Sequence, residues 1–289
     1  MQIDLIETFL DLMETSSFNR TGERLGITQS TVSNRVQALE ASLGRKLFAR
    51  SRAGTRPTAA GLRFLDHARN LRHEWTQASR AVARVHDFDQ ALRIGMQHDL
   101  AASHVGEWVS EFRATQPATY FYVELDYSIQ MNADLLSGAL DLAVLFTPGH
   151  LPDIHYDRVG EISYCMISDT AERLSEVKPE RYIFANYSPA FDRLHRQIAG
   201  NLVDAPLASG QDRVVAGMLA SLGGSAYVLD ETAKVMIEAE IYRLVEDAPP
   251  ITQAVYAAVH LQHRHSHIHK RLLSVIRNHF SQDTAIAEF

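Results

Sequence analysis

Three helical patterns separated by tight turns, all within the first 43 residues, constrain the fold of this chain more than any other feature. Residues 4–14 repeat apolar side chains at helical spacing (Leu5, Ile6, Phe9, Leu12 and Met13), and we expect the acidic ones between them, Asp11 included, to face solvent. Gly26 should end a short second helix over residues 18–25. Thr28 is a good N-cap for a third, whose apolar arc is Val32, Val36, Leu39 and Leu43. The pattern predicts a helix-turn-helix.

The opposite arc of the third helix carries small or hydrogen-bonding side chains instead of long charged ones. Such residue types contact base edges and phosphates in a DNA major groove. The candidate DNA-binding residues of this helix are Thr28, Gln29, Ser30, Ser33, Asn34, Arg35 and Gln37. For the helix taken alone, an ordinary solvated face is the alternative.

An arginine-rich loop follows the third helix. Arg50, Arg52 and Arg56 surround Gly54 in a segment short enough for a two-stranded wing. Beside a recognition helix, such a wing would place its arginines against phosphates or in the minor groove. A merely solvated loop is the alternative.

The run from Phe18 to Gly61 resembles the signature of the LysR-type transcriptional regulators. The matching elements are Thr28-Gln29-Ser30, Ser33, Leu39-Glu40, Leu43-Gly44, Leu47-Phe48, Arg50 and Pro57-Thr58. Thr21-Gly22 stands where the family usually has two alanines, and both pairs are small. The resemblance implies a winged helix-turn-helix in which Gln29, Ser30, Ser33 and Asn34 face bases. By the same resemblance, Arg35, Arg50 and Arg56 face the backbone or the minor groove.

Residues 62–85 contain no Gly or Pro and predict one long helix, capped by Thr58. Its apolar residues alternate at spacings of four and three, which is the seam of a coiled coil. The dimerisation candidates are Phe64, Leu71, Trp75 and Val82. A helix packed on its own domain is the alternative, but the resemblance favours dimers that bind inverted repeats. The segment over residues 71–82 is also similar to a subgroup represented by a regulator of the flagellar master operon.

Charge is divided unevenly along the chain. Residues 1–87 carry 13 Lys and Arg against 9 Asp and Glu, whereas residues 88–289 carry 15 against 26. Because phosphate contacts supply most sequence-independent DNA affinity, a basic head on an acidic body suits a protein that binds DNA through its head.

The acidic body alternates strand-like and helical segments, which predicts a parallel α/β fold. Strand-like runs at 91–96, 120–126 and 140–146 are separated by helical stretches at 107–115 and 133–137. A second set, at 162–168, 182–185, 203–208, 226–229 and 255–259, indicates a second lobe.

The body resembles the periplasmic-binding-protein-like effector domain of the same family, most closely over residues 138–145 and 214–229. The resemblance implies a winged helix-turn-helix over residues 1–58, a linker helix over 59–87 and an effector domain over 88–289. Lobe 1 would comprise about 88–160 and 255–289, and lobe 2 about 161–254.

Clefts of open parallel sheets lie at the carboxyl ends of strands, where helix N-termini offer free N–H groups. The effector-binding candidates chosen on this ground are Gln97, His98, Ser103, Tyr127, Ser128, Phe146, Thr147, Ser209 and Gln211. Gln97-His98 stands where the family often has Ser or Thr, which argues against a simple carboxylate as the effector.

Other features favour no catalytic or metal chemistry. The five histidines between His260 and His269 lack a nearby carboxylate or cysteine to complete a metal site, so a solvated or interfacial helix is the preferred interpretation. We expect Cys165 to be buried and to pack as a small apolar residue. The sequence contains no nucleophile elbow, phosphate loop, HExxH motif or dinucleotide turn, so we expect neither an enzyme nor a cofactor.

The expected partners are double-stranded DNA with an inverted repeat, an unidentified small-molecule effector and the chain itself, as a homodimer or homotetramer. No run of roughly 20 apolar residues and no basic start typical of a signal peptide is present, so we expect a cytoplasmic protein without a membrane partner. An architectural DNA-binding protein with an inert body is the competing class.

Overall fold

The computed structural model describes residues 2–51, 54–82 and 88–286. The chain forms two compact units, Met1–Ala91 with Leu136–Ala139 and Leu92–Leu135 with Leu140–Phe289. The head, helices α1 to α4 with the wing, and the effector domain, strand β3 to helix α10, are described in turn.

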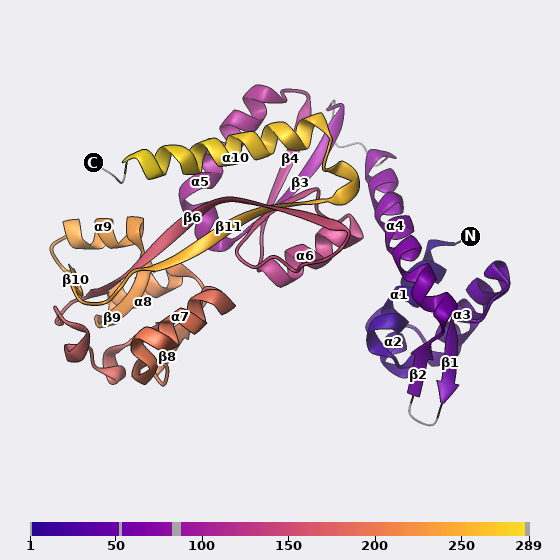
Figure 1. Ribbon diagram of the computed structural model, residues 1–289, viewed down its shortest axis with the longest axis horizontal. Coiled ribbons are helices and arrows are strands. Elements are labelled where there is room, and N and C mark those ends of the chain that lie inside the picture. The colour runs from indigo at the N-terminus through magenta and orange to yellow at the C-terminus, as the bar shows by residue number, and fades with distance from the viewer. Residues whose placement is uncertain (1, 52–53, 83–87, 287–289) are drawn as a thin grey trace. The chain divides into compact units, whose positions relative to one another are not determined.

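The head is a winged helix-turn-helix, as the sequence predicts. Helices α1 (Ile3–Thr15), α2 (Phe18–Leu25) and α3 (Gln29–Leu43) precede an antiparallel wing of β1 (Phe48–Ser51) and β2 (Gly54–Pro57), and α4 (Ala59–Val82) follows (Figure 1). The predicted caps are present: the Thr28 side chain accepts from Thr31 N–H at 3.2 Å, and Thr58 accepts from Gly61 N–H at 3.1 Å. Ile6, Phe9, Val32 and Leu39 fill the core between the helices.

Two expectations for the head are wrong. Asp11 is 8% exposed, and its Oδ2 lies 3.0 Å from Nε of Arg24 on α2, so the carboxylate joins two helices instead of facing solvent. Leu43 is 39% exposed because it lies in the last turn of α3, immediately before the helix ends at left-handed Gly44. A helical projection treats every turn as equally covered by the core, whereas the turns at helix ends are not.

The effector domain is built on one large mixed sheet and one small parallel pair. The large sheet has the order β10-β6-β11-β5-β3-β4, with β9 also paired to β6. Its strands are β3 (Gln90–Met96), β4 (Thr119–Leu125), β5 (Leu142–Leu145), β6 (Ile154–Ser168), β9 (Ser225–Leu229), β10 (Arg243–Leu244) and β11 (Ile251–His260), and the pair is β7 (Ile183–Ala185) with β8 (Leu207–Ser209). The helices are α5 (His98–Thr115), α6 (Ser128–Ser137), α7 (Pro189–Ala199), α8 (Asp212–Leu222), α9 (Asp230–Glu238) and α10 (His267–Ile286).

Two separate hydrophobic cores confirm the predicted lobes. In lobe 1, α5 and α10 pack on the sheet through residues such as Trp108 and Leu272 (Figure 1), and in lobe 2 Tyr182, Phe191 and Leu219 lie in the second core. The lobes share a sheet, because antiparallel β6 and β11 run through both. Strand β6 begins at Ile154, whereas the sequence predicts a strand only from residue 162. The prediction missed the first half of β6 because that half is polar and lacks the apolar pattern of a buried strand.

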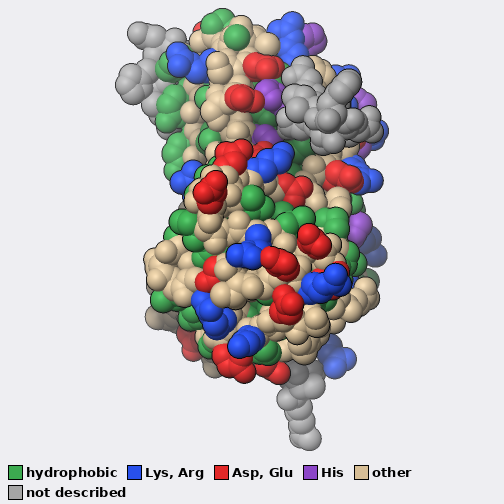
Figure 2. Space-filling model, turned by 90° about the vertical axis from the view of Figure 1, so that its left-hand side faces the viewer, with side chains coloured by type: hydrophobic (Ala, Val, Ile, Leu, Met, Phe, Trp, Pro, Cys, Tyr) green, Lys and Arg blue, Asp and Glu red, His purple; other side chains and the backbone are tan. Residues whose placement is uncertain are grey.

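The face that Figure 2 turns to the viewer carries charged side chains of both signs. On this face, Lys and Arg alternate with Asp and Glu and do not gather into one basic patch. Mixed charge of this kind does not create the extended positive potential that DNA binding uses.

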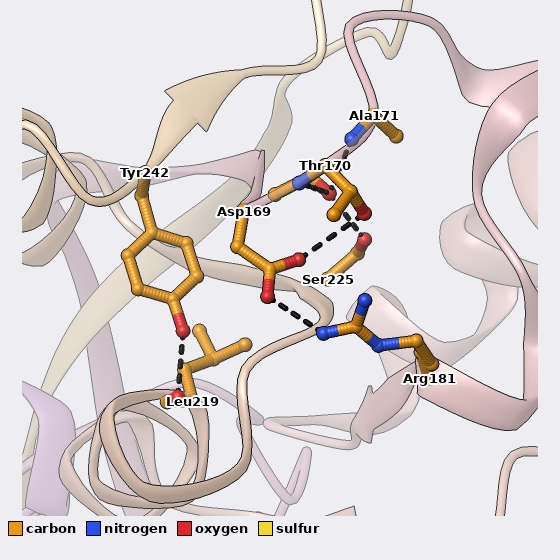
Figure 3. A network of polar contacts seen from close by, with 8 residues as sticks. Asp169, Thr170, Ala171, Arg181, Leu219, Ser225 and Tyr242 are labelled. Atoms are coloured by element: carbon orange, nitrogen blue, oxygen red, sulfur yellow. Dashed lines mark hydrogen bonds and ion pairs between the residues drawn. The ribbon is translucent and has the colours of Figure 1, made fainter.

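The turn between α8 and β9 is fixed by a polar network (Figure 3). Gly224 has φ of 105°, and a Cβ there would lie 2.1 Å from the carbonyl oxygen of Arg181. The Arg181 guanidinium donates to Asp169 at 2.7 Å, and Tyr242 donates to the Leu219 carbonyl at 2.6 Å. The Gly223-Gly224 pair therefore lets this backbone approach closely and start β9 in register.

Candidate nucleic-acid interface and effector cleft

The polar arc of α3 is accessible. Gln29, Ser30, Asn34 and Gln37 are exposed and Ser33 is half-buried. Thr28 acts as the N-cap, and its hydroxyl is also within hydrogen-bonding distance of the Ser30 and Thr31 hydroxyls, at 2.9 and 2.8 Å. The first turn of α3 is therefore ordered by its own side chains, with amide and hydroxyl groups presented outward.

Arg35 differs from the other predicted DNA contacts. Its guanidinium lies 2.8 Å from the Asp4 carboxylate and 3.3 Å from the Thr8 hydroxyl, both on α1. Sequence spacing cannot reveal this partner, because Asp4 is 31 residues away. In this structure Arg35 joins α1 to α3.

The wing is attached to the head by a buried carboxylate. Glu40 Oε1 accepts from the N–H groups of Leu47 and Phe48 at 2.8 and 3.2 Å, and Oε2 lies 2.7 Å from Lys46 Nζ. Burial alone would raise the pKa of Glu40, but these hydrogen bonds bring the pKa below its usual value. Sequence reasoning noted Glu40 only as part of the signature and missed this role.

The wing arginines are described only in part. Arg56 lies on β2 opposite Ala49 and is exposed. The Arg50 side chain and all of Arg52 lie outside the described residues.

Along α4, the predicted seam divides into two parts. Phe64 is half-buried, with its ring centroid 5.2 Å from that of Phe9, and so belongs to the head core. Further on, Leu71, Trp75 and Val82 are 40%, 55% and 84% exposed.

At the strand ends of lobe 1, the predicted effector residues form a hydrogen-bonded cluster. Ser128 Oγ donates to Gln97 Oε1 at 3.3 Å and accepts from the N–H groups of Phe146 and Thr147 at 3.2 and 3.1 Å. Gln97 and Ser128 are buried. The residues predicted from three separate strand ends therefore meet at one place, where the Ser128 side chain bonds the Gln97 side chain and the backbone of Phe146 and Thr147.

Several contacts cross between the lobes. Gln211 donates to the Tyr127 hydroxyl at 3.4 Å, and Ser103 donates to Glu231. Ser209 Oγ accepts from Gln211 N–H at 3.3 Å, within lobe 2. Within lobe 1, the His98 ring lies beside that of Tyr127, with the centroids 5.2 Å apart and the ring planes tilted by 40°.

Asp99 and Asp212, which the sequence analysis did not select, form the most buried of these contacts. Asp99 Oδ1 accepts from Asp212 N–H at 3.0 Å, and Oδ2 accepts from the Tyr164 hydroxyl at 2.9 Å. Burial raises the pKa of Asp99 to about 6 and also raises that of Asp212. An acid in a first helical turn is a common sequence feature, so no signal separated Asp99 from its neighbours.

Two cavities flank this contact. One, of about 480 Å³, has mostly apolar walls from α5 and β4, including Val105, Val123 and Leu125, with His98 and Gln211 among its polar residues. The other, of about 400 Å³, is lined equally by polar and apolar surface, and Ser103 is one of its lining residues. Asp99 and Leu229 line both. Either cavity falls within the usual size range of small-molecule sites.

The histidine-rich segment is not one helix. His263 ends a short 3₁₀ turn and His267 begins α10, while His260 and His269 are buried instead of solvated. Burial lowers the pKa of His269 to about 4, which keeps the ring neutral. Among the described residues, no group of three or more His, Cys, Asp or Glu could hold a metal ion. Cys165 is half-buried in β6, and burial raises its thiol pKa to about 12.

A winged helix-turn-helix followed by a two-lobed α/β domain defines the class of bacterial ligand-responsive regulators. Residues 3–62 match the family described as "Bacterial regulatory helix-turn-helix protein, lysR family", and residues 87–281 match "LysR substrate binding domain". The chain belongs to the LysR family of transcriptional regulators, which confirms the resemblance found in the sequence.

Similar proteins cover nearly the whole chain. The HTH-type transcriptional regulator HdfR of Yersinia pestis is 25% identical over 268 residues, 89% of this chain and 90% of that protein. ArgP from Mycobacterium tuberculosis is 20% identical with a TM-score of 0.58, covering 96% of each chain. DarR of Vibrio fischeri, solved in complex with DNA, is 18% identical with a TM-score of 0.57, covering 96% of this chain and 99% of that one. Within the described part of the chain, no helix has the length and apolarity to span a membrane.

Proposed function

We propose that the head binds double-stranded DNA at an inverted repeat, with two copies of the chain joined through α4. The exposed polar arc of α3, beside a wing that carries Arg56, is the observation that carries this proposal. Thr28, Gln29, Ser30, Ser33, Asn34 and Gln37 would face the major groove, and Arg50, Arg52 and Arg56 the phosphates or minor groove. Arg35 would support this surface by joining α3 to α1.

The domain boundaries we propose are 1–58, 59–87 and 88–289. In the effector domain, a small molecule would bind in the cleft between the lobes and favour one arrangement of the dimer or tetramer. His98, Ser103 and Gln211, which line the two cavities, are the candidates best supported for direct contact. The protein would act in the cytoplasm by binding and without catalysis.

Selection of bound duplexes from random DNA by the purified full chain tests the proposal. We expect recovery of an inverted repeat, with affinity that falls steeply as salt rises. DarR in complex with DNA and LysG of Corynebacterium glutamicum with bound effector Arg support a search for both kinds of ligand. Failure of a folded sample to enrich any sequence at low salt would contradict the proposal.

A further inference from the structure

Asp99 lies where the N-termini of two helices from different lobes meet. Asp99 is the second residue of α5, and Asp212 is the first residue of α8. The backbone N–H of Asp212 donates a hydrogen bond to the Asp99 carboxylate. Asp99 is 5% exposed. The backbone N–H groups at a helix N-terminus attract anions, because they lack partners within the helix and point along its dipole. The chain's own carboxylate thus occupies a position that a ligand anion could otherwise take.

The contact belongs to a continuous series of hydrogen bonds. Tyr164 of β6 donates to Asp99, which in turn accepts from Asp212 N–H. The Asp212 carboxylate accepts from Leu229 N–H at 2.7 Å and from the Thr232 hydroxyl at 2.5 Å. The series therefore runs from the shared sheet through α5 of lobe 1 into α8, β9 and α9 of lobe 2.

Most of the ionisable side chains around the cavity of about 400 Å³ are acidic. Glu161, Asp230 and Glu231 line the cavity of about 400 Å³ together with Asp99, against Lys234. Because Asp99 and Leu229 are part of the wall of both cavities, a ligand that fills either one contacts this series of bonds.

We propose that Asp99 is a built-in anion of the cleft, which holds α8 to α5 and excludes negatively charged ligands from the N-terminus of α8. The inference rests on the proposed function only in treating the cleft as the effector site. It specifies the effector class: the part of the effector that reaches this junction is neutral or cationic.

Chemical rescue with acetate tests the inference on the full chain. In Asp99→Ala the Asp212 N–H and the Tyr164 hydroxyl lose their acceptor in a buried place, so the melting temperature should fall by about 3–10 °C. Acetate at tens of millimolar should restore part of that loss, because it supplies the missing carboxylate to the folded state alone. Sodium chloride at equal ionic strength should not, and acetate should leave the wild type unchanged.

Asp192→Ala is the matched control. Like Asp99, Asp192 is in the first turn of a helix, here α7 of lobe 2. It pairs with Arg196 within that helix, so acetate should give no rescue. If Asp99→Ala does not fold, Asp99→Ser leaves space for acetate and suits a first helical turn.

Rescue specific to the Asp99 variants supports the inference. Melting of Asp99→Ala at the wild-type temperature, or equal stabilisation of wild type and variant by acetate, overturns it. The melting measurement uses no DNA, so it remains decisive whether or not the protein selects an operator.

Discussion

The Glu40 carboxylate holds the wing beside α3. Glu40→Ala would leave two buried N–H groups without an acceptor, and we expect a loss of about 1–3 kcal/mol in unfolding free energy. Because the folded pKa of Glu40 is lowered, its contribution is present above the unfolded pKa and is lost as pH falls through the folded value. The difference in unfolding free energy between wild type and variant, measured with urea, should therefore be largest at pH 7 and shrink as pH falls below the usual range of a glutamate. A constant difference down to pH 3 would contradict this role.

Asp99 should show the opposite dependence on pH. With its pKa raised to about 6, the folded state binds a proton more tightly than the unfolded chain, so the unfolding free energy should fall as pH rises from about 4 to 6. The groups that act on Asp99, or on which it acts, are Asp212 of α8, Tyr164 of β6 and Tyr187 before α7. Asp99→Asn should flatten this interval, because the amide cannot ionise. An unchanged profile would refute the assignment.

Helix α3 and the wing should contribute differently to DNA binding. Gln29→Ala removes a side chain that we propose to contact bases, so the binding free energy should weaken by about 1–3 kcal/mol on the selected site and hardly at all on random duplex. Arg56→Ala should weaken both equally and reduce the salt slope by about one. Fluorescence anisotropy at several salt concentrations measures both effects. Equal losses on both duplexes for Gln29→Ala would refute its base contact.

The turn after α8 gives a test that involves no ligand. Gly224→Ala would place a Cβ against the Arg181 carbonyl at a φ that L residues rarely adopt, and we expect a loss of at least about 1–3 kcal/mol. Gly217→Ala, in α8 with open space around its Cβ, is the control and should slightly stabilise the helix. Thermal unfolding of both variants measures this loss of stability. Equal melting temperatures for Gly224→Ala and Gly217→Ala would show that the turn can relax.

Element types could be predicted from the sequence because caps, turns and apolar periods are local. Gly26, Thr28 and Thr58 mark helix ends whatever the rest of the chain does. The partners of Arg35 and Asp99 could not be predicted, because Asp4 and Asp212 lie 31 and 113 residues away and only the folded chain brings them close. The contacts between residues of the two lobes depend likewise on the antiparallel pairing of β6 with β11, which no local pattern encodes.

For the whole molecule, the exposed part of α4 should determine assembly. Trp75 is 55% exposed although it is large and apolar, and Leu71 and Val82 lie in the same predicted seam. Trp75→Ala should shift the protein to a smaller species in sedimentation at micromolar concentration, and should weaken binding to an inverted repeat more than to a half-site, since only a dimer engages both halves. Glu74→Ala, at the neighbouring exposed position, should change neither. An unchanged mass for Trp75→Ala with a normal helical content would move the assembly surface away from α4.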